Sequence, residues 1–280
     1  MINVLFCGND KVFDGVLTCA LSILKRTQTK EPFTFYLYTL DLTNLNPVFR
    51  AISKQSASFL GEVVKEYNSD NRVVLIDVKD VYDKELAGSP NEASSYSPYA
   101  MLRVLADLVD NMPPKLLYLD ADILLNRDIR LLYDINVEDY EYAAARDHYG
   151  KYLVNPNYIN SGVLLLNLEK IKETGLFSKA RGELRKRKLA FPDQTAIRIN
   201  TVKKKMLPQK FNDQKFLHKS TVVRHFSKRL FWLPYPHTAN VKQWQVSLVH
   251  KIFGYYEFDD ILYEYLYLKE KFNREVAKHE

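Results

Sequence analysis

Short apolar runs of strand length alternate with segments of helical periodicity along most of this sequence, and this alternation restricts its fold most strongly. Apolar runs rich in aromatic and β-branched residues predict strands over Ile2–Cys7, Phe33–Leu40, Arg72–Val78, Lys115–Leu119, Tyr142–Arg146 and Val163–Asn167. Helical spacing predicts helices over Val16–Arg26, Asn46–Glu66, Ser94–Val109, Leu168–Glu173, Ser178–Lys188 and Asp193–Asn200. This alternation indicates an α/β fold with a mostly parallel central sheet flanked by helices. Ligands of such sheets bind beyond the carboxyl ends of the strands, so polar residues there are candidate site residues.

Length and cysteine content exclude several classes of protein. A chain of 280 residues can bury about 70–75% of the surface that its unfolded form exposes, so it needs no disulfide framework. No apolar run reaches the roughly 18–20 residues of a membrane span. Cys7 and Cys19 lie in apolar surroundings, which favours a reducing compartment. The opening residues MINVLFCGND do not resemble a signal peptide, so we expect a cytoplasmic protein.

Positive charge is concentrated in the second half of the chain. Residues 1–140 contain 14 Lys and Arg against 20 Asp and Glu, whereas residues 141–280 contain 26 against 14. The basic half is either an ordinary solvated surface or a surface that attracts an anionic partner. We expect no nucleic-acid partner, because no aromatic residues interleave with the basic runs at 179–188 and 203–205 to stack on bases.

The strongest local signal is a pair of acids, Asp120 and Asp122, in the otherwise apolar segment LYLDADILL. In an extended chain, residues i and i+2 point to the same side. Two carboxylates close together repel each other, and a divalent cation such as Mg²⁺ or Mn²⁺ relieves that repulsion because it prefers hard oxygen ligands. The alternative is an ordinary exit from a strand into a turn, where Asp is common.

Two further segments carry polar residues at the edges of predicted elements. Asn160 and Ser161 precede a strand, and their side chains suit hydrogen bonds to sugar hydroxyls, while Gly162 permits close approach; a plain polar turn is the alternative. Asp193 and Gln194 open a predicted helix, where Asp193 is either an N-cap or part of a pair that grips a polar ligand.

Basic and aromatic residues follow further along the chain. His225 ends a short apolar run in VVRH and is either a structural histidine or, if a metal is present, a third protein ligand. Downstream, Lys242-Gln243-Trp244 places a cation close to an aromatic ring.

In their order along the chain, these motifs resemble glycosyltransferase family 8, the family of glycogenin and of bacterial lipooligosaccharide galactosyltransferases. The resemblance covers residues 2 to about 245 and rests on the segments NVLFCGND, LYLDADIL, YINSGVLLLNL, PDQTA and RHF. It implies a GT-A fold and a retaining transferase that moves galactose or glucose from a UDP-sugar with the help of Mn²⁺ or Mg²⁺. It also implies a glycan, glycolipid or glycoprotein acceptor in bacterial surface glycan assembly. The alternative is a catalytically silent sugar- or nucleotide-binding protein on the same fold.

The resemblance assigns roles to individual residues. The metal ligands match Asp120, Asp122 and His225. The residues that match donor contacts are Cys7, Gly8, Asn9 and Asp10 of the loop that cups uridine, together with Arg103, Asp120 and Ala121. Asp147 and Asn160 match groups that orient sugar hydroxyls, and Asp193 and Gln194 match the pair beside the reacting carbon.

The segment after His225 departs from the family pattern. Family members often continue with H-F-x-G-x-x-K-P-W, which closes on the diphosphate, whereas here Ser227, Lys228 and Arg229 follow and the nearest K-x-W begins at Lys242. We expect Lys242 to meet the diphosphate, with Lys228 or Arg229 as the alternative. Retention of configuration requires either same-face attack or double displacement through Asp193 or Gln194, and the sequence leaves both open.

The end of the chain is rich in aromatic residues. We expect a catalytic domain over residues 1–230 and a helical extension over residues 231–280, packed on or near the active site. Aromatic and basic residues together predict either a packed extension that carries acceptor contacts or a peripheral contact with the inner face of a membrane.

Overall fold

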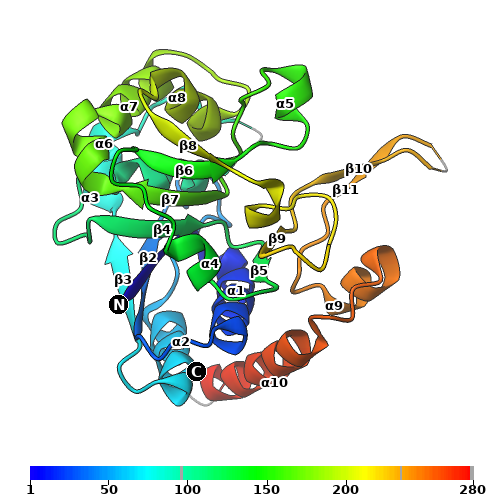
Figure 1. The fold of residues 1–280 in the computed structure, drawn as a ribbon. Coiled ribbons are helices and arrows are strands. Elements are labelled where there is room, and N and C mark those ends of the chain that lie inside the picture. Colours follow the sequence, from blue (N-terminus) through cyan, green and yellow to red (C-terminus); the bar gives the residue numbers. More distant parts are fainter. Residues whose placement is uncertain (95–96, 234, 278–280) are drawn as a thin grey trace.

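A seven-stranded sheet forms the centre of the molecule (Figure 1). The computed structural model describes residues 1–94, 97–233 and 235–277. Along the sheet, the strands lie in the order β3 (Arg72–Asp77), β2 (Phe33–Thr39), β1 (Ile2–Cys7), β4 (Lys115–Leu119), β7 (Val163–Asn167), β6 (Tyr142–Ala145) and β8 (Lys204–Leu207). Strand β7 runs antiparallel to β4 and β6, and the other pairs are parallel. The expected α/β fold with a mostly parallel sheet is confirmed.

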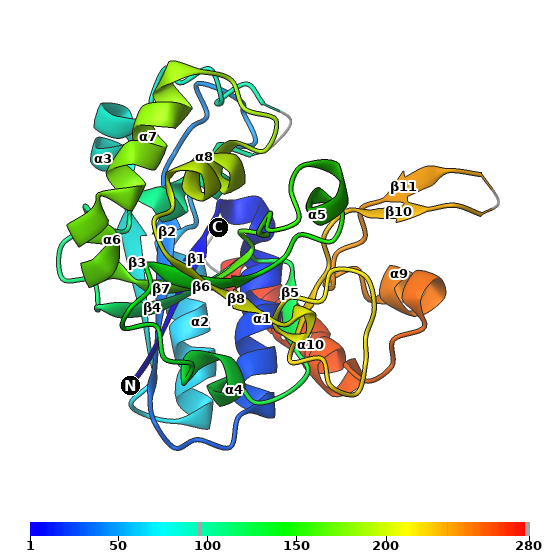
Figure 2. The same ribbon diagram turned by 45° about the horizontal axis from the view of Figure 1, so that its top comes forward.

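Helices cover both faces of this sheet (Figures 1 and 2). One face packs against α1 (Phe13–Arg26) and α2 (Lys54–Tyr67), and the other packs against the 3₁₀ helix η2 (Pro98–Leu105), α7 (Leu176–Lys186) and α8 (Pro192–Asn200). Side chains of β1 alternate between these two layers, because successive residues of a strand point to opposite faces. Val4 and Phe6 join the core with α1, whereas Leu5 and Cys7 join the core with η2.

Some helix boundaries differ from those that the sequence predicts. The helix expected from Asn46 begins instead at Lys54, where the Ser53 hydroxyl caps it by accepting the N–H of Ser56 at 2.9 Å. The helix expected over 94–109 is the 3₁₀ helix η2, and residues 95 and 96 of that range lie outside the described part of the chain. Helix α3 (Lys79–Glu85) and strand β8 were not expected.

The remaining short elements connect the sheet to the rest of the chain. They are the 3₁₀ helices η1 (Asp10–Val12) and η3 (Gln209–Phe211), the helices α4 (Arg130–Tyr133), α5 (Gly150–Leu153) and α6 (Leu168–Thr174), and a two-stranded sheet of β5 (Ile123–Leu125) and β9 (Val223–His225).

The C-terminal part is not purely helical, contrary to expectation. It begins with a hairpin of β10 (Arg229–Phe231) and β11 (His237–Ala239), which projects from the molecule (Figure 1). Helix α9 (Val246–Leu248), a π-helical turn (Val249–Phe253) and α10 (Asp259–Val276) follow, and α10 packs against α1. Residues 234 and 278–280 of the expected extension lie outside the described part. No described helix combines the length and hydrophobicity that a transmembrane span requires.

Candidate active site

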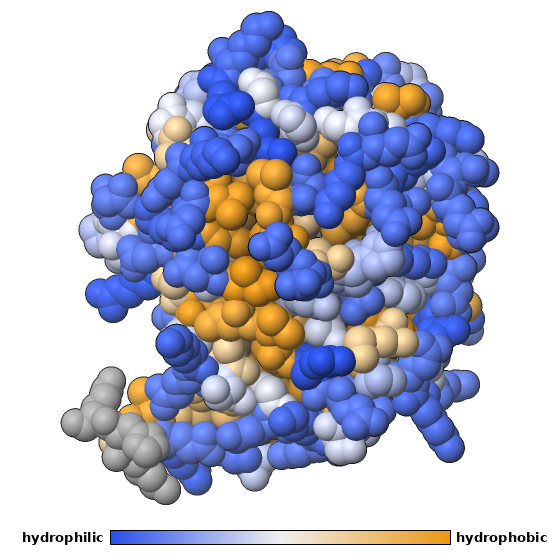
Figure 3. Space-filling model, turned by 90° about the vertical axis from the view of Figure 1, so that its left-hand side faces the viewer, coloured by the Kyte–Doolittle hydropathy of each residue, from blue (hydrophilic) through white to orange (hydrophobic). Residues whose placement is uncertain are grey.

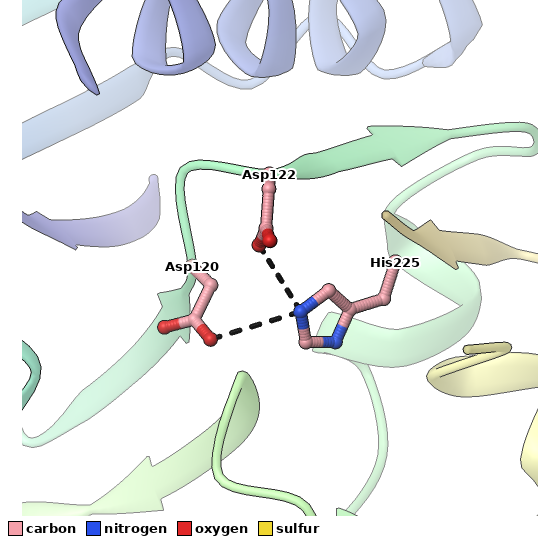
Figure 4. Close-up of side chains that lie close together, drawn as sticks. All are labelled: Asp120, Asp122 and His225. Atoms are coloured by element: carbon pink, nitrogen blue, oxygen red, sulfur yellow. Dashed lines mark ion pairs between the residues drawn. The ribbon is translucent and has the colours of Figure 1, made fainter. Parts of the chain in front are cut away.

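The pairing of β5 with β9 brings the acidic pair and the histidine together. Residues 120–122 form the turn between β4 and β5, and Ile123 pairs with His225 across the two-stranded sheet. Nε2 of His225 lies 3.1 Å from Oδ1 of Asp122 and 3.8 Å from Oδ2 of Asp120 (Figure 4). The two carboxylates therefore converge from a turn rather than along one side of a strand.

These three side chains form a donor set that fits a divalent cation. One ligand atom from each lies within 4.8 Å of the others. Nζ of Lys242 donates a hydrogen bond to Oδ2 of Asp122. Burial raises the pKa of the Asp122 carboxyl, but the charges of Lys242 and His225 outweigh burial and hold that pKa well below its usual range. Asp122 is therefore ionised, as a metal ligand must be, and two carboxylates with one imidazole suit Mn²⁺ or Mg²⁺.

Gly162 leaves the space in which Asp120 and His225 approach each other. A Cβ at this position would lie 2.5 Å from Cε1 of His225 and 2.6 Å from Oδ2 of Asp120. The carbonyl of Gly162 also accepts the N–H of Asp120 at 2.8 Å. The close approach that the sequence analysis expected at this glycine is thus made by Asp120 and His225.

Arg103 is a buried cation that connects the acidic pair to α8. Its Nη2 donates to Oδ1 of Asp120 at 3.0 Å, and its Nε lies 3.4 Å from Oδ2 of Asp193. The guanidinium lies over the ring of Tyr118, whose hydroxyl donates to Oδ1 of Asp120 at 2.5 Å. Burial alone would lower the pKa of Arg103, but the neighbouring negative charges of Asp193 and Asp120 raise it above its usual value. Arg103 therefore offsets negative charge at both acids.

Asp193 and Gln194 are buried in the first turn of α8 and point toward the loop before β7. Oδ2 of Asp193 accepts the hydroxyl of Ser161 at 2.8 Å, and Oε1 of Gln194 accepts the N–H of Ser161 at 3.1 Å. The N-cap position belongs to Phe191, so the N-cap interpretation of Asp193 is wrong. The PDQ segment thus presents two polar side chains to the site.

These groups line one cavity of about 570 Å³. Its lining includes Arg103, Asp120, Asp122, Asn160, Ser161, Gly162, Asp193, Gln194, His225, Lys228 and Lys242. The acidic pair therefore lies in the same space as the polar residues of the expected sugar site.

The cavity continues into a second recess at the carboxyl end of β1. Cys7, Gly8 and Asn9 line it, together with Tyr99, Ala121 and Trp244. Asp10 lies apart from this recess, because it is exposed and borders a separate hollow beside α10. Three of the four residues expected to cup uridine are thus brought together. Burial raises the pKa of the Cys7 thiol, which makes it an inert lining group.

Asp147 also lies outside the lining of the cavity. Its Oδ1 accepts the N–H groups of Tyr149 at 3.0 Å and of Gly150 at 2.6 Å, and its Oδ2 accepts Nδ2 of Asn160 at 2.9 Å. Both carboxylate oxygens are therefore engaged within the protein, and Asn160 lies between Asp147 and the cavity.

The three candidate diphosphate contacts lie in different places. Lys242 points at Asp122 and lines both recesses of the cavity. Lys228 is exposed at the rim, and Arg229 lies over the rings of Phe216 and Phe231.

Several residues of the site carry no signal in the sequence. Gln243 is fully buried, and its Nε2 donates to the carbonyl of Ala121 at 2.7 Å and to Oγ1 of Thr18 at 3.1 Å, which fixes the loop that carries Lys242. Oδ1 of Asn212 lies 3.0 Å from Nδ1 of His225. A buried amide that bridges distant segments has no local pattern, whereas the acids interrupt an apolar run.

Comparisons with solved structures agree with this fold. An active-site mutant of LgtC superposes with a TM-score of 0.66 at 16% identity, over 96% of both chains. Glycosyltransferase GlyE of Streptococcus pneumoniae TIGR4 superposes with a TM-score of 0.60 at 19% identity, over 94% of this chain and 63% of the other. At these identities the likeness shows the fold alone, which is the expected GT-A fold.

Sequence comparisons identify relatives and a family. A putative glycosyltransferase of Haemophilus influenzae is 26% identical over 191 residues, which cover 64% of this chain and 52% of the relative. Glycosyltransferase GlyF of Streptococcus pneumoniae serotype 4 is 28% identical over 122 residues, which cover 44% of this chain and 29% of the relative. The chain thus spans about half or less of these relatives. The model of glycosyl transferase family 8 matches residues 3–221, well over half of the chain. The chain therefore belongs to glycosyl transferase family 8.

Proposed function

We propose that this protein is a retaining, metal-assisted hexosyltransferase that moves galactose or glucose from a UDP-sugar to a glycan, glycolipid or glycoprotein acceptor in bacterial surface glycan assembly. The observation that carries the proposal is the convergence of Asp120, Asp122 and His225 at the wall of a polar cavity. The family places the chain among glycosyltransferases, and the cavity has room for a nucleotide-sugar across its two recesses.

The metal ligands and Lys242 would stabilise the negative charge of the leaving group, UDP. A Mn²⁺ or Mg²⁺ ion held by Asp120, Asp122 and His225 would act as a Lewis acid on the diphosphate. Lys242 is the cation closest to Asp122, so its Nζ is placed to donate to a phosphate oxygen where negative charge grows. The uracil and ribose would occupy the recess beside Asn9 and Tyr99.

Arg103, Asp193 and Gln194 would orient the transferred sugar. Double displacement would need a free carboxylate on the face opposite the diphosphate. Oδ2 of Asp193 is engaged by Ser161 and Arg103, and Oε1 of Gln194 is engaged by the Ser161 N–H. These bonds orient the two side chains, which suits a positioning role and same-face attack, whereas double displacement would have to proceed through Oδ1 of Asp193.

The decisive test is metal-dependent release of UDP. UDP-galactose and UDP-glucose are supplied separately to the purified protein, with Mn²⁺ and with EDTA, and UDP is measured. We expect release from one of the two donors that requires the metal and is lost in Asp122→Asn, while Glu62→Gln on α2 behaves like the wild type. If both sugar nucleotides bind but neither releases UDP with added sugar acceptors, the protein is the catalytically silent alternative.

We also propose that the hairpin touches the inner face of a membrane from the cytoplasmic side. Trp232, Leu233 and Tyr235 are 65–83% exposed at its tip, and the second half of the chain is basic. Exposed aromatic side chains with surrounding positive charge suit the interface of an anionic bilayer. The test is flotation with phosphatidylglycerol vesicles, where Trp232→Ser with Leu233→Ser should lose binding. The matched control is Tyr263→Ser with Tyr267→Ser on α10, which should retain it; equal binding of both double variants would contradict the proposal.

A further inference from the structure

We propose that Asp147, Asn160 and Asn212 form a hydrogen-bond relay that fixes the tautomer of His225, so that Nδ1 carries a proton and Nε2 remains free to bind a metal ion. The proposal rests on the proposed function, because it adds a positioning device to the metal site of that function. It also gives Asp147 a different role from the sugar contact that the family resemblance implies.

The relay is a continuous chain of short contacts. Nδ2 of Asn160 donates to Oδ2 of Asp147 at 2.9 Å, and Nδ2 of Asn212 donates to Oδ1 of Asn160 at 2.8 Å. Oδ1 of Asn212 then lies 3.0 Å from Nδ1 of His225. The contact between Asn160 and Asn212 joins residues 52 positions apart, so the chain of contacts depends on the fold rather than on a local turn.

Two fixed groups determine the direction of every hydrogen bond in this chain. A carboxylate oxygen of Asp147 accepts, so the amide nitrogen of Asn160 must face it. The backbone N–H of Gly162 can only donate, and it lies 3.0 Å from Oδ1 of Asn160. Both observations give Asn160 the same orientation, which removes the usual ambiguity between amide oxygen and nitrogen. Oδ1 of Asn160 therefore accepts from Nδ2 of Asn212, and the oxygen of Asn212 is left to face His225.

The histidine must then donate from Nδ1. With Nδ1 donating to Asn212, Nε2 is the ring nitrogen that faces the acids. In the charged form of the ring, Nε2 donates its proton to Asp122, and a metal ion that binds there replaces that proton and takes the lone pair. Nε2 points at Asp120 and Asp122 (Figure 4). Histidines that bind metals commonly hold their second ring nitrogen in this way, which fixes both the tautomer and the ring plane.

Burial makes the relay rigid. Asn212 is fully buried and His225 is 3% exposed, so water cannot readily replace a lost partner. Asp147 is itself fixed by the N–H groups of Tyr149 and Gly150. The N–H groups at the start of α5 thus fix Asp147, and through it the direction of each hydrogen bond as far as His225.

The test replaces Asn212, which accepts from Nδ1 in the relay. It measures the Nδ1–H signal of His225 and the Mn²⁺ affinity separately. In the wild type, we expect a protected Nδ1–H signal of His225 in ¹H–¹⁵N spectra, without metal and with Mg²⁺. In Asn212→Leu, that signal should be lost and Mn²⁺ affinity should fall by about 10- to 100-fold, the usual effect of losing a second-layer partner. Because Asn212→Leu can also lower stability, Asp147→Asn provides a milder variant that should weaken Mn²⁺ binding several-fold.

Asn71→Leu is the matched control. Asn71 is an equally buried amide, which accepts from Phe33 N–H and donates to the Val64 carbonyl far from the site. It should lose stability without losing Mn²⁺ affinity. An unprotonated Nδ1 in the wild type, or equal Mn²⁺ binding by the wild type and both relay variants, overturns the relay. If the wild type binds no Mn²⁺ while its Nδ1–H signal is present, the proposed metal-assisted function fails instead.

Discussion

At the scale of single residues, Gly162 is the glycine that packs directly against two of the proposed metal ligands. Its φ is not positive, so its backbone does not require glycine. Glycine is required here by lack of space, because a Cβ would lie 2.5 Å from the His225 ring and 2.6 Å from the Asp120 carboxylate. We expect Gly162→Ala to displace one of these ligands and to lower Mn²⁺ affinity on the order of 10-fold, measured by calorimetry.

Gly61→Ala is the control for that substitution. A Cβ at Gly61 in α2 meets nothing within 4 Å, and alanine favours a helix over glycine by about 1 kcal/mol. This variant should keep Mn²⁺ affinity and gain thermal stability. Unchanged Mn²⁺ affinity in Gly162→Ala would show that the site adapts or that the metal binds elsewhere.

The ion pair of Lys242 with Asp122 predicts that Lys242 competes with a metal ion for that carboxylate. Its ammonium group occupies the Oδ2 acceptor of Asp122. Lys242→Met should therefore strengthen Mn²⁺ binding several-fold in the absence of nucleotide, while UDP binding weakens because a phosphate contact is lost. Calorimetric titrations of each ligand separate the two effects.

Lys228→Met tests the alternative assignment in the same assay. Lys228 is exposed at the rim of the cavity, so we expect neither titration to change. Loss of UDP affinity in this variant, with normal UDP affinity in Lys242→Met, would assign the diphosphate contact to Lys228.

Residues of the site could be predicted from the sequence where a charged or polar side chain stands in or at the end of an apolar run. Asp120 and Asp122 interrupt an apolar run, and His225 ends one, so each attracts notice. The position of Asp147 was not predictable, because both of its oxygens are turned inward by local N–H groups and Asn160. Asn212 lies in the polar segment KFNDQKF, where nothing in the sequence distinguishes its amide from its neighbours.

At the scale of elements, apolar strands were easier to predict than the segments that depend on tertiary contacts. The buried strands β1, β2, β4 and β7 match their predicted ranges within one residue. Strand β8 was missed because KKML carries two lysines, and it becomes a strand only by pairing with β6. The hairpin β10–β11 was missed because its strands, RLF and HTA, are three residues each, which is too short to show an alternating pattern. They form strands by pairing with each other.

Ion pairs at the junction of α10 with α1 predict an acid-sensitive contact. Both guanidinium Nη atoms of Arg26 donate to Asp260 at 2.7 Å. These hydrogen bonds lower the pKa of the Asp260 carboxyl against a smaller opposing effect of burial. A depressed folded-state pKa gives stability that is present above the unfolded value of about 4 and is lost as the pH falls through the folded value.

Asp260→Asn should therefore lower the free energy of unfolding by about 0.5–1 kcal/mol at pH 7, because the pair is partly exposed. The difference from the wild type should shrink as the pH is lowered below about 4. Urea denaturation at a series of pH values measures both effects, with Glu62→Gln as the control, since no ion pair of Glu62 occurs in the described part of the chain. A pH-independent difference would mean that Asp260 acts through helix packing rather than charge.

At the scale of the whole molecule, the site joins the two parts that the sequence suggested. The first part supplies Asn9, Asp120 and Asp193, and the segment after residue 231 supplies Lys242 and Trp244. Strand β10 crosses the expected boundary at residue 230. On the surface, a band of apolar side chains covers part of the side of the molecule where the edge strand β3 lies (Figure 3).

The shared core predicts that residues 231–280 unfold together with residues 1–230. Leu262 of α10 is fully buried in the same apolar cluster as the side chains of α1 and β1. Leu262→Ala should lower the free energy of unfolding by about 2–5 kcal/mol, because it leaves a cavity in that core. The chain contains two tryptophans, Trp232 and Trp244, and both lie in the second part.

Tryptophan fluorescence therefore reports on the second part, whereas far-UV circular dichroism reports on the whole chain. For one cooperative unit, the two urea denaturation curves coincide in the wild type and shift together in Leu262→Ala. Leu266→Ala is the control on the same helix, since Leu266 is 42% exposed and should cost no more than about 0.5 kcal/mol. A fluorescence transition that precedes the dichroism transition would show that the extension is an independent unit, and the active site would then depend on how firmly that unit is docked.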